Sequence, residues 1–139
     1  SLVGGATSTV GIEHPDVEVL GLNYFSLAAS FIDDIRESDT GGMSHAGEFE
    51  TSLMLHLRPE LVQLDRAEAP YLDEPYDLGV SDLMEGASLS VYRSFESYTD
   101  SGAIGDPRLA TSEKGAEIYD RLGDELADLL GEIHERNRR

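Results

Sequence analysis

Hydrophobic residues are arranged along the chain in a pattern that predicts an α/β domain. Residues 17–24 (VEVLGLNY) are mostly apolar and rich in strand-forming types, which is typical of a buried strand in a parallel sheet. Residues 25–37 follow with Phe25, Ala28, Ile32 and Ile35 at helical spacing. Because a strand followed directly by a helix is the repeating unit of α/β folds, we expect that class here.

Two further helices are predicted. One runs from about Ser44 to Arg58, after a glycine-bearing loop at 39–44, and ends there because Pro59 cannot continue it. The other begins at Thr111 or Ser112, either of which can cap a helix. Its apolar stripe has steps of three and four residues and consists of Ile118, Leu122, Leu126, Leu129 and Ile133.

The remaining segments predict shorter or irregular structure. Residues 61–64 and 88–94 are expected to form short strands, 65–85 a long ordered loop, and 98–110 a turn-rich segment. Residues 1–16 predict a loop at 4–6 and a short helix, with no strand before them. One well-marked parallel strand is too few for a sheet. We therefore expect a single domain over 1–139 that is the C-terminal portion of a larger one, with 1–16 as a remnant.

The chain is strongly acidic, with 28 Asp and Glu against 10 Lys and Arg and a net charge of −18. Such a surface repels nucleic acid and anionic lipid, so neither is expected as a partner. The acids are spread along the chain, which favours a solvated surface adapted to high salt over cation buffering, and so a halophilic, archaeal source. No apolar stretch approaches the ~20 residues of a membrane span. No leader is recognisable, and a cytoplasmic location is expected. The absence of cysteine excludes disulfides and thiolate metal sites.

The most informative chemistry lies in residues 44–52, which place His45 and Glu48 at the mouth of the second predicted helix. If that helix begins by Ser44, the i, i+3 spacing puts both side chains on one face. They could then share a divalent metal, or Glu48 could orient the imidazole for acid–base work. The alternative is a histidine bonded to the backbone beside an ordinary first-turn glutamate. Glu50, on the other side of the helix, is expected to bind a neighbouring loop or arginine.

Several motifs resemble the creatininase (creatinine amidohydrolase) family. They are residues 45–55 (HAGEFETSLML) with 59–62 (PELV), and later 102–107 (GAIGDP) with 110–115 (ATSEKG). Their order and spacing also fit, so that the matching region covers 17–135. The resemblance implies a three-layer α/β/α domain, assembled as a homo-oligomer. It further implies hydrolysis of a C–N amide bond, in a cyclic amide or a formamide, with a divalent metal (zinc, manganese or iron) as cofactor.

The resemblance also assigns roles to residues. His45 matches the family histidine that passes a proton to the leaving nitrogen and is not a metal ligand, and Glu48 is expected to assist it. Gly42 and Ser44 are the candidate substrate-binding residues. The family's N-terminal metal ligands have no counterpart here, and residues 3–6 (VGGA) replace its His-Gly-Gly-Asn loop. The chain alone is therefore not expected to supply metal ligands.

Three functions stay open at this point. The first is an amidohydrolase portion acting on a small-molecule amide. Creatinine itself is disfavoured, because creatininase has a tryptophan and two acids just before its histidine, where this chain has Gly41, Gly42 and Ser44. The second is a non-catalytic remnant or assembly subunit. The third is a small-molecule binding module with its pocket beside residues 41–48.

Overall fold

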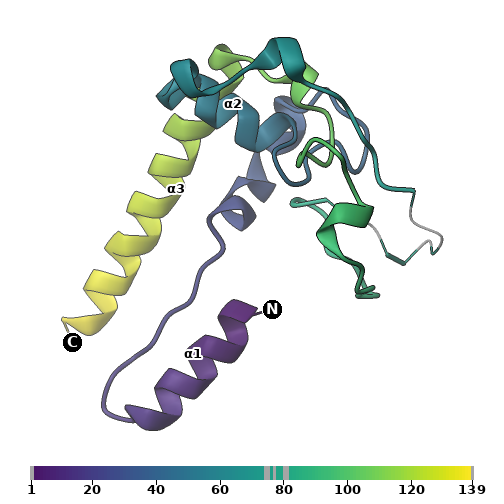
Figure 1. Cartoon of the computed structure of the whole chain (residues 1–139). Helices are drawn as coiled ribbons and strands as arrows, with labels where there is room; N and C mark the ends of the chain where they lie inside the picture. The colour runs from purple at the N-terminus through teal and green to yellow at the C-terminus, as the bar shows by residue number, and fades with distance from the viewer. Residues whose placement is uncertain (1, 74–75, 77, 80–81, 139) are drawn as a thin grey trace.

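Helices make up the regular structure of the chain. The computed structural model describes residues 2–73, 76, 78–79 and 82–138, and within these ranges it contains α-helices and short 3-10 helices but no strand. The α-helices are α1 (Leu2–Glu13), α2 (Glu48–Leu57) and α3 (Ser112–Asn137). The 3-10 helices are η1 (Tyr24–Ser30), η2 (Ile32–Asp34), η3 (Pro59–Leu61), η4 (Leu64–Arg66), η5 (Phe95–Ser97) and η6 (Pro107–Leu109). Figure 1 shows α2 crossing the first turns of the long α3.

Helix α3 confirms its prediction. The Thr111 hydroxyl accepts a hydrogen bond from the Lys114 backbone N–H at 3.1 Å, which caps the helix start. Ile118, on the predicted stripe, is fully buried, and Leu122 packs against the same core. The core cluster consists of Ala28, Phe31, Ile32, Ile35, Met43, Phe49 and Ile118.

Helices α2 and α3 approach closely at Gly115, where they cross. A Cβ added to Gly115 of α3 would lie 1.9 Å from the Ser52 carbonyl oxygen of α2, so only glycine fits there. The Ser52 hydroxyl accepts a hydrogen bond from the Thr111 backbone N–H at 3.3 Å, beside the crossing. This contact ties the start of α3 to the middle of α2 and so to the loop that precedes α2.

The predicted strands are not formed. Residues 17–23 are extended but unpaired, residues 61–64 fall in the turns around η3 and η4, and residues 88–94 are irregular. A strand is stable only when its backbone groups pair with another strand, and none of the described residues forms a strand beside these segments. The helix predicted over 25–37 is replaced by η1 and η2, which are separated at Phe31, where φ is −142°. In the predicted loop over 65–85, residues 74, 75, 77, 80 and 81 lie outside the described residues.

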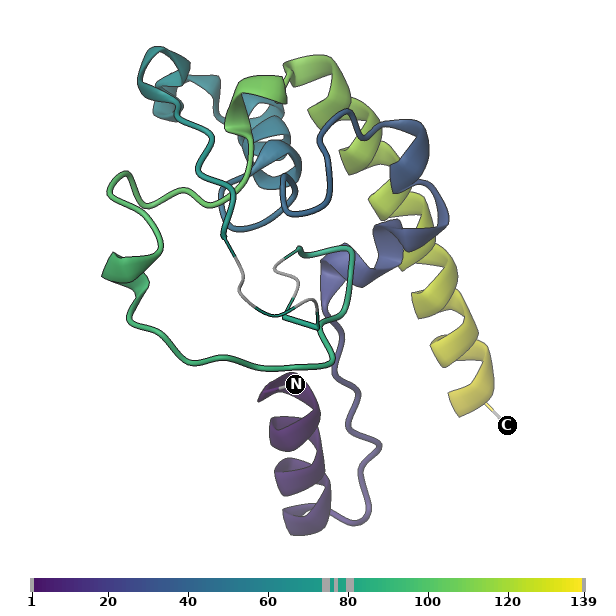
Figure 2. The ribbon, with the colours of Figure 1, turned by 90° about the vertical axis from the view of Figure 1, so that its right-hand side faces the viewer.

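Helix α1 stands apart from the rest of the fold (Figures 1 and 2). It includes residues 4–6, for which a loop was predicted, and none of its described residues is buried. A turn at 14–17 and the extended residues 18–23 connect it to η1. No helix in the described ranges is long and apolar enough to cross a membrane.

Candidate functional site

The loop before α2 presents His45 at the surface, and a distant segment of the chain holds it there. The His45 carbonyl oxygen accepts a hydrogen bond from the Ile104 N–H at 2.7 Å. The Gly42 carbonyl oxygen accepts two, from the N–H groups of Asp106 (2.9 Å) and Glu48 (3.1 Å). Residues 102–107 and 45–55, which were both singled out from the sequence, therefore lie side by side.

The backbone conformation at residues 46–47 directs the histidine. Ala46 has a φ of 51°, in the left-handed region that non-glycine residues adopt at a cost. Two side chains from α2 hold it there: the Glu50 carboxylate accepts the Ala46 N–H at 2.7 Å, and the Thr51 hydroxyl donates to the Ala46 carbonyl at 2.9 Å. At Gly47 a Cβ would come within 2.2 Å of the Gly42 carbonyl oxygen, so the turn requires glycine.

His45 lies beside Glu50, not beside Glu48. Its Nδ1 is 3.8 Å from Glu50 Oε2, and 60% of its side chain is exposed. Its ring also meets the ring of Phe95 edge to face, with the centroids 5.4 Å apart. Glu50 thus binds the neighbouring loop, as the sequence suggested, and is in addition the carboxylate that faces the imidazole.

Glu48 is fully buried and binds elsewhere. Its carboxylate accepts hydrogen bonds from the Ser38 N–H (2.9 Å) and the Glu37 N–H (3.1 Å) and pairs with the Lys114 ammonium group. Burial by itself would raise the pKa of Glu48, but the bonds from Lys114, Ser38 and Glu37 outweigh it and lower that pKa. The predicted contact between His45 and Glu48 is wrong, because the helix begins at Glu48 instead of Ser44 and Glu48 therefore faces the core.

The two candidate substrate-binding residues, Gly42 and Ser44, are both buried. Gly42 uses its carbonyl oxygen within the loop, as described above, and Ser44 accepts the Gly47 N–H at 2.9 Å through its own carbonyl. Their role in binding a substrate stays a prediction. In this structure they support the loop that carries His45.

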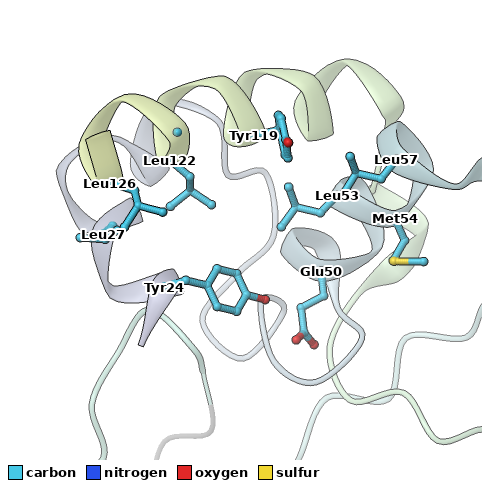
Figure 3. Close-up of a pocket in the computed structure, with 10 residues that line it drawn as sticks. Tyr24, Leu27, Glu50, Leu53, Met54, Leu57, Tyr119, Leu122 and Leu126 are labelled. Carbon is cyan, nitrogen blue, oxygen red and sulfur yellow. The ribbon is translucent and has the colours of Figure 1, made fainter. Parts of the chain in front are cut away.

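Hollows open beside α2 and beside the turn at Ala46. An apolar groove of about 550 Å³ lies between η1, α2 and α3 (Figure 3). It is lined by Tyr24, Leu27, Glu50, Leu53, Met54, Leu57, Tyr119, Leu122, Gly123 and Leu126. Burial, and then the nearby Glu50 carboxylate, raise the pKa of the Tyr24 hydroxyl, and Figure 3 shows that hydroxyl pointing toward Glu50. A second hollow, of about 560 Å³, is bordered by Ala46, Glu50 and Thr51 on the other side. Glu50 therefore stands between an apolar groove and the turn that bears His45.

Two residues of the site were missed from the sequence. Lys114 pairs with Glu48 across 66 positions, and no local pattern could show that contact. The one available signal was composition, because Lys114 is the single lysine among ten basic residues. Glu50 was set aside because it lies opposite Glu48 on the helix, yet the turn at Ala46 brings the imidazole round to its side.

The described residues do not fit a divalent metal. Across 2–73, 76, 78–79 and 82–138, no three His, Cys, Asp or Glu side chains gather in a way that could hold an ion. The nearest candidates are already engaged, Glu48 with Lys114 and Glu50 with the Ala46 backbone. We therefore assign no metal ligand among the residues that the structure describes.

The chain is similar in sequence to peptidases of two mycobacteria. The chain is 34% identical to the mycofactocin precursor peptide peptidase of Mycobacterium ulcerans (strain Agy99) over 90 residues. These residues are 65% of this chain and 33% of that protein. It is 32% identical over 85 residues to the same peptidase of Mycobacterium tuberculosis (strain H37Rv), covering 61% and 31%. The chain thus spans about a third of the length of these relatives.

The chain is also similar to solved structures of creatininase-like proteins. The putative creatinine amidohydrolase of Bacteroides fragilis NCTC 9343 superposes with a TM-score of 0.69 at 29% identity, over 90% of this chain and 46% of that one. A creatininase variant described as the Zn-Zn type superposes with a TM-score of 0.62 at 26% identity, over 94% and 49%. The fold is therefore creatininase-like. Since the sequence model described as creatinine amidohydrolase also matches residues 3–130, the chain belongs to the creatininase family.

Proposed function

We propose that this chain takes part in the hydrolysis of a C–N amide bond, with His45 as the residue that handles the proton. Amide nitrogen is a poor leaving group unless it is protonated as the bond breaks. An imidazole titrates near neutral pH and can therefore give up a proton and regain it in one cycle. The substrate is a cyclic amide, a formamide or a peptide amide.

In the proposed step, the imidazolium of His45 gives its proton to the leaving nitrogen, which takes the electron pair of the breaking C–N bond. Water supplies a hydroxyl group to the carbonyl carbon, and its remaining proton restores the imidazolium. Glu50, 3.8 Å from Nδ1, orients the ring, which leaves Nε2 for the substrate. Glu48 acts on His45 only through the backbone, by anchoring the start of α2.

The observation that supports this proposal is the exposed imidazole beside a carboxylate, on a turn fixed from both sides. The ring is open to solvent, a hollow adjoins its turn, and the Ile104 and Glu50 contacts hold the backbone on either side. The metal that the family uses does not fit the described residues. Its ligands belong, in this proposal, to the part of a three-layer α/β/α domain that the chain does not cover.

A second candidate is a non-catalytic subunit, which keeps its fold but performs no chemistry. The lack of a metal-binding cluster among the described residues favours it. The two candidates differ in one respect that can be measured: in the subunit, substitution of His45 changes no activity.

The experiment joins this chain by a flexible linker to the part of the Bacteroides fragilis protein that lies outside their match. The fusion is loaded with zinc, manganese or iron and assayed against creatinine, N-formyl amines and short peptides. We expect hydrolysis of at least one amide, with kcat lowered about 100-fold or more in His45→Gln and unchanged in His134→Gln, an exposed histidine far along α3. Equal kcat in both variants, or no hydrolysis by the fusion, refutes the proposal.

A further inference from the structure

We propose that Phe95 is a positioning residue for His45: its ring, together with the Glu50 carboxylate, holds the imidazole in one orientation. In this role Phe95 acts through the histidine and not on a substrate. The consequence for catalysis rests on the proposed function, whereas the orientation of the ring is a property of the chain itself and is tested separately.

The Glu50 carboxylate does not fix the imidazole by itself. The distance of 3.8 Å between His45 Nδ1 and Glu50 Oε2 is longer than a direct hydrogen bond, and the same carboxylate oxygen already accepts the Ala46 N–H at 2.7 Å. The His45 side chain is also 60% exposed. Because exposed side chains change rotamer within picoseconds to nanoseconds, a ring with this contact alone would sample several orientations.

Phe95 supplies the second contact. Its ring lies edge to face with the imidazole, with 84° between the ring planes and 5.4 Å between the centroids. Aromatic pairs prefer this arrangement and this spacing. Phe95 is not part of the core cluster, and 49% of it is exposed. Core packing therefore does not account for the place of this ring beside the histidine.

The segment that carries Phe95, residues 91–104 (the arm), is bound to the His45 loop at a second point. The Ile104 N–H donates to the His45 carbonyl oxygen at 2.7 Å, so the arm contacts both the backbone and the ring of this histidine. Within the arm, Phe95 begins η5, and its carbonyl oxygen accepts the Tyr98 N–H at 3.0 Å. The Tyr98 ring also meets the Phe95 ring edge to face, with the centroids 6.5 Å apart. These contacts keep Phe95 facing the histidine.

The ring pair gives His45 a moderate preference for one rotamer. An edge-to-face pair favours its own geometry about two- to tenfold over orientations that lose the contact. A catalytic group that is oriented before the substrate arrives has less freedom to lose in the transition state. We therefore expect loss of the Phe95 ring to lower kcat, because fewer His45 rings then face the leaving nitrogen. KM should stay nearly unchanged, because the proton is transferred after the substrate has bound.

The orientation of the ring is measured by NMR on the full chain. In the unchanged protein we expect nuclear Overhauser effects between the His45 and Phe95 rings, and Hα–Hβ couplings that report a single His45 rotamer. Phe95→Leu removes the ring but keeps an apolar side chain, and the couplings of His45 should then be averaged over several rotamers. Phe95→Tyr keeps the ring and should keep the single rotamer.

Two controls separate the ring from general effects on the arm. Tyr92→Leu changes a side chain of the same arm that is 93% exposed, and it should leave the His45 couplings unchanged. The Ile104 amide, which bonds to the His45 backbone, should stay protected from hydrogen exchange in every variant. The inference is overturned by averaged couplings in the unchanged protein or by a single His45 rotamer in Phe95→Leu. Release of the Ile104 amide in Phe95→Leu also overturns it, because the arm then acts through the backbone.

The catalytic consequence is measured in the fusion described under the proposed function. Phe95→Leu should lower kcat by about threefold or more and leave KM within about twofold, whereas Phe95→Tyr and Tyr92→Leu should keep kcat within about twofold. Equal kcat in Phe95→Leu and Tyr92→Leu, or a loss confined to KM, overturns the positioning role while the proposed function stands. A fusion that hydrolyses nothing refutes the proposed function alone, because the NMR couplings still decide whether Phe95 orients His45.

Discussion

Replacing Lys114 by methionine tests the central electrostatic claim, that a buried carboxylate holds the loop bearing His45. Glu48 is fully buried, and only 11% of the Lys114 side chain is exposed. Methionine keeps most of the packing volume and removes the charge. The variant leaves Glu48 with the two N–H groups of Glu37 and Ser38 and without a cation of its own.

Removing one partner of a buried ion pair costs about 3–5 kcal/mol, against about 0–1 kcal/mol for an exposed pair. Because two backbone bonds to Glu48 survive, we expect the lower end, about 3 kcal/mol. With a urea m-value of about 1.5 kcal/mol per molar, the midpoint of unfolding then falls by about 2 M at pH 7. A protonated Glu48 needs no cation, so the loss should shrink at pH 4 and below.

The assay is urea unfolding followed by circular dichroism at pH 7 and pH 4. Arg58→Met is the matched control, because Arg58 pairs with Glu60 where both side chains are more than half exposed, and it should cost less than about 1 kcal/mol. The double variant Glu48→Gln/Lys114→Met should lose less than the sum of the single variants. A loss for Lys114→Met below 1 kcal/mol, or one equal at both pH values, would refute the role given to this pair.

Three further outcomes are expected. The lowered pKa of Glu48 contributes stability that is present above its unfolded pKa of about 4.3 and is lost as the pH falls further. In a plot of melting temperature against pH, the acid side should therefore be flatter for Glu48→Gln. An unchanged acid side would contradict this. Burial lowers the pKa of Lys114, but its contacts with Glu48 and Glu37 outweigh burial and raise that pKa. The folding stability that this pair contributes should therefore be lost only above about pH 10.4, and the loss should be absent from Lys114→Met. Gly115→Ala should lower stability by about 1–3 kcal/mol in urea unfolding, since its Cβ would overlap the Ser52 carbonyl, whereas Gly123→Ala on the same helix, where nothing lies within 4 Å, should be neutral or stabilising.

The parts of the fold that the sequence predicts correctly are those with local causes. Helix α3 has its cap at Thr111 and its apolar stripe within one segment, so both can be found without knowing any other part of the chain. The strand over 17–24 failed for the opposite reason. Its composition is that of a strand, but a strand needs a partner for its backbone groups, and the described residues supply none. Composition thus identified the right kind of segment, and pairing decided its structure.

The candidate site shows how a small error in a helix boundary reverses an assignment. With a start at Ser44, His45 and Glu48 would share a face; with the observed start at Glu48, the left-handed turn at Ala46 intervenes and the imidazole meets Glu50 instead. No periodicity could show this turn, because it is held by Glu50 and Thr51 of α2 and by Ile104 from a segment nearly sixty residues away. The same long-range contacts free Glu48 to pair with Lys114. The two glutamates therefore have different roles: Glu50 faces the histidine, and Glu48 anchors the start of the helix that follows it. Under the proposed function, substituting Glu50 should consequently lower kcat more than it lowers the free energy of unfolding, whereas substituting Glu48 should lower the free energy of unfolding first.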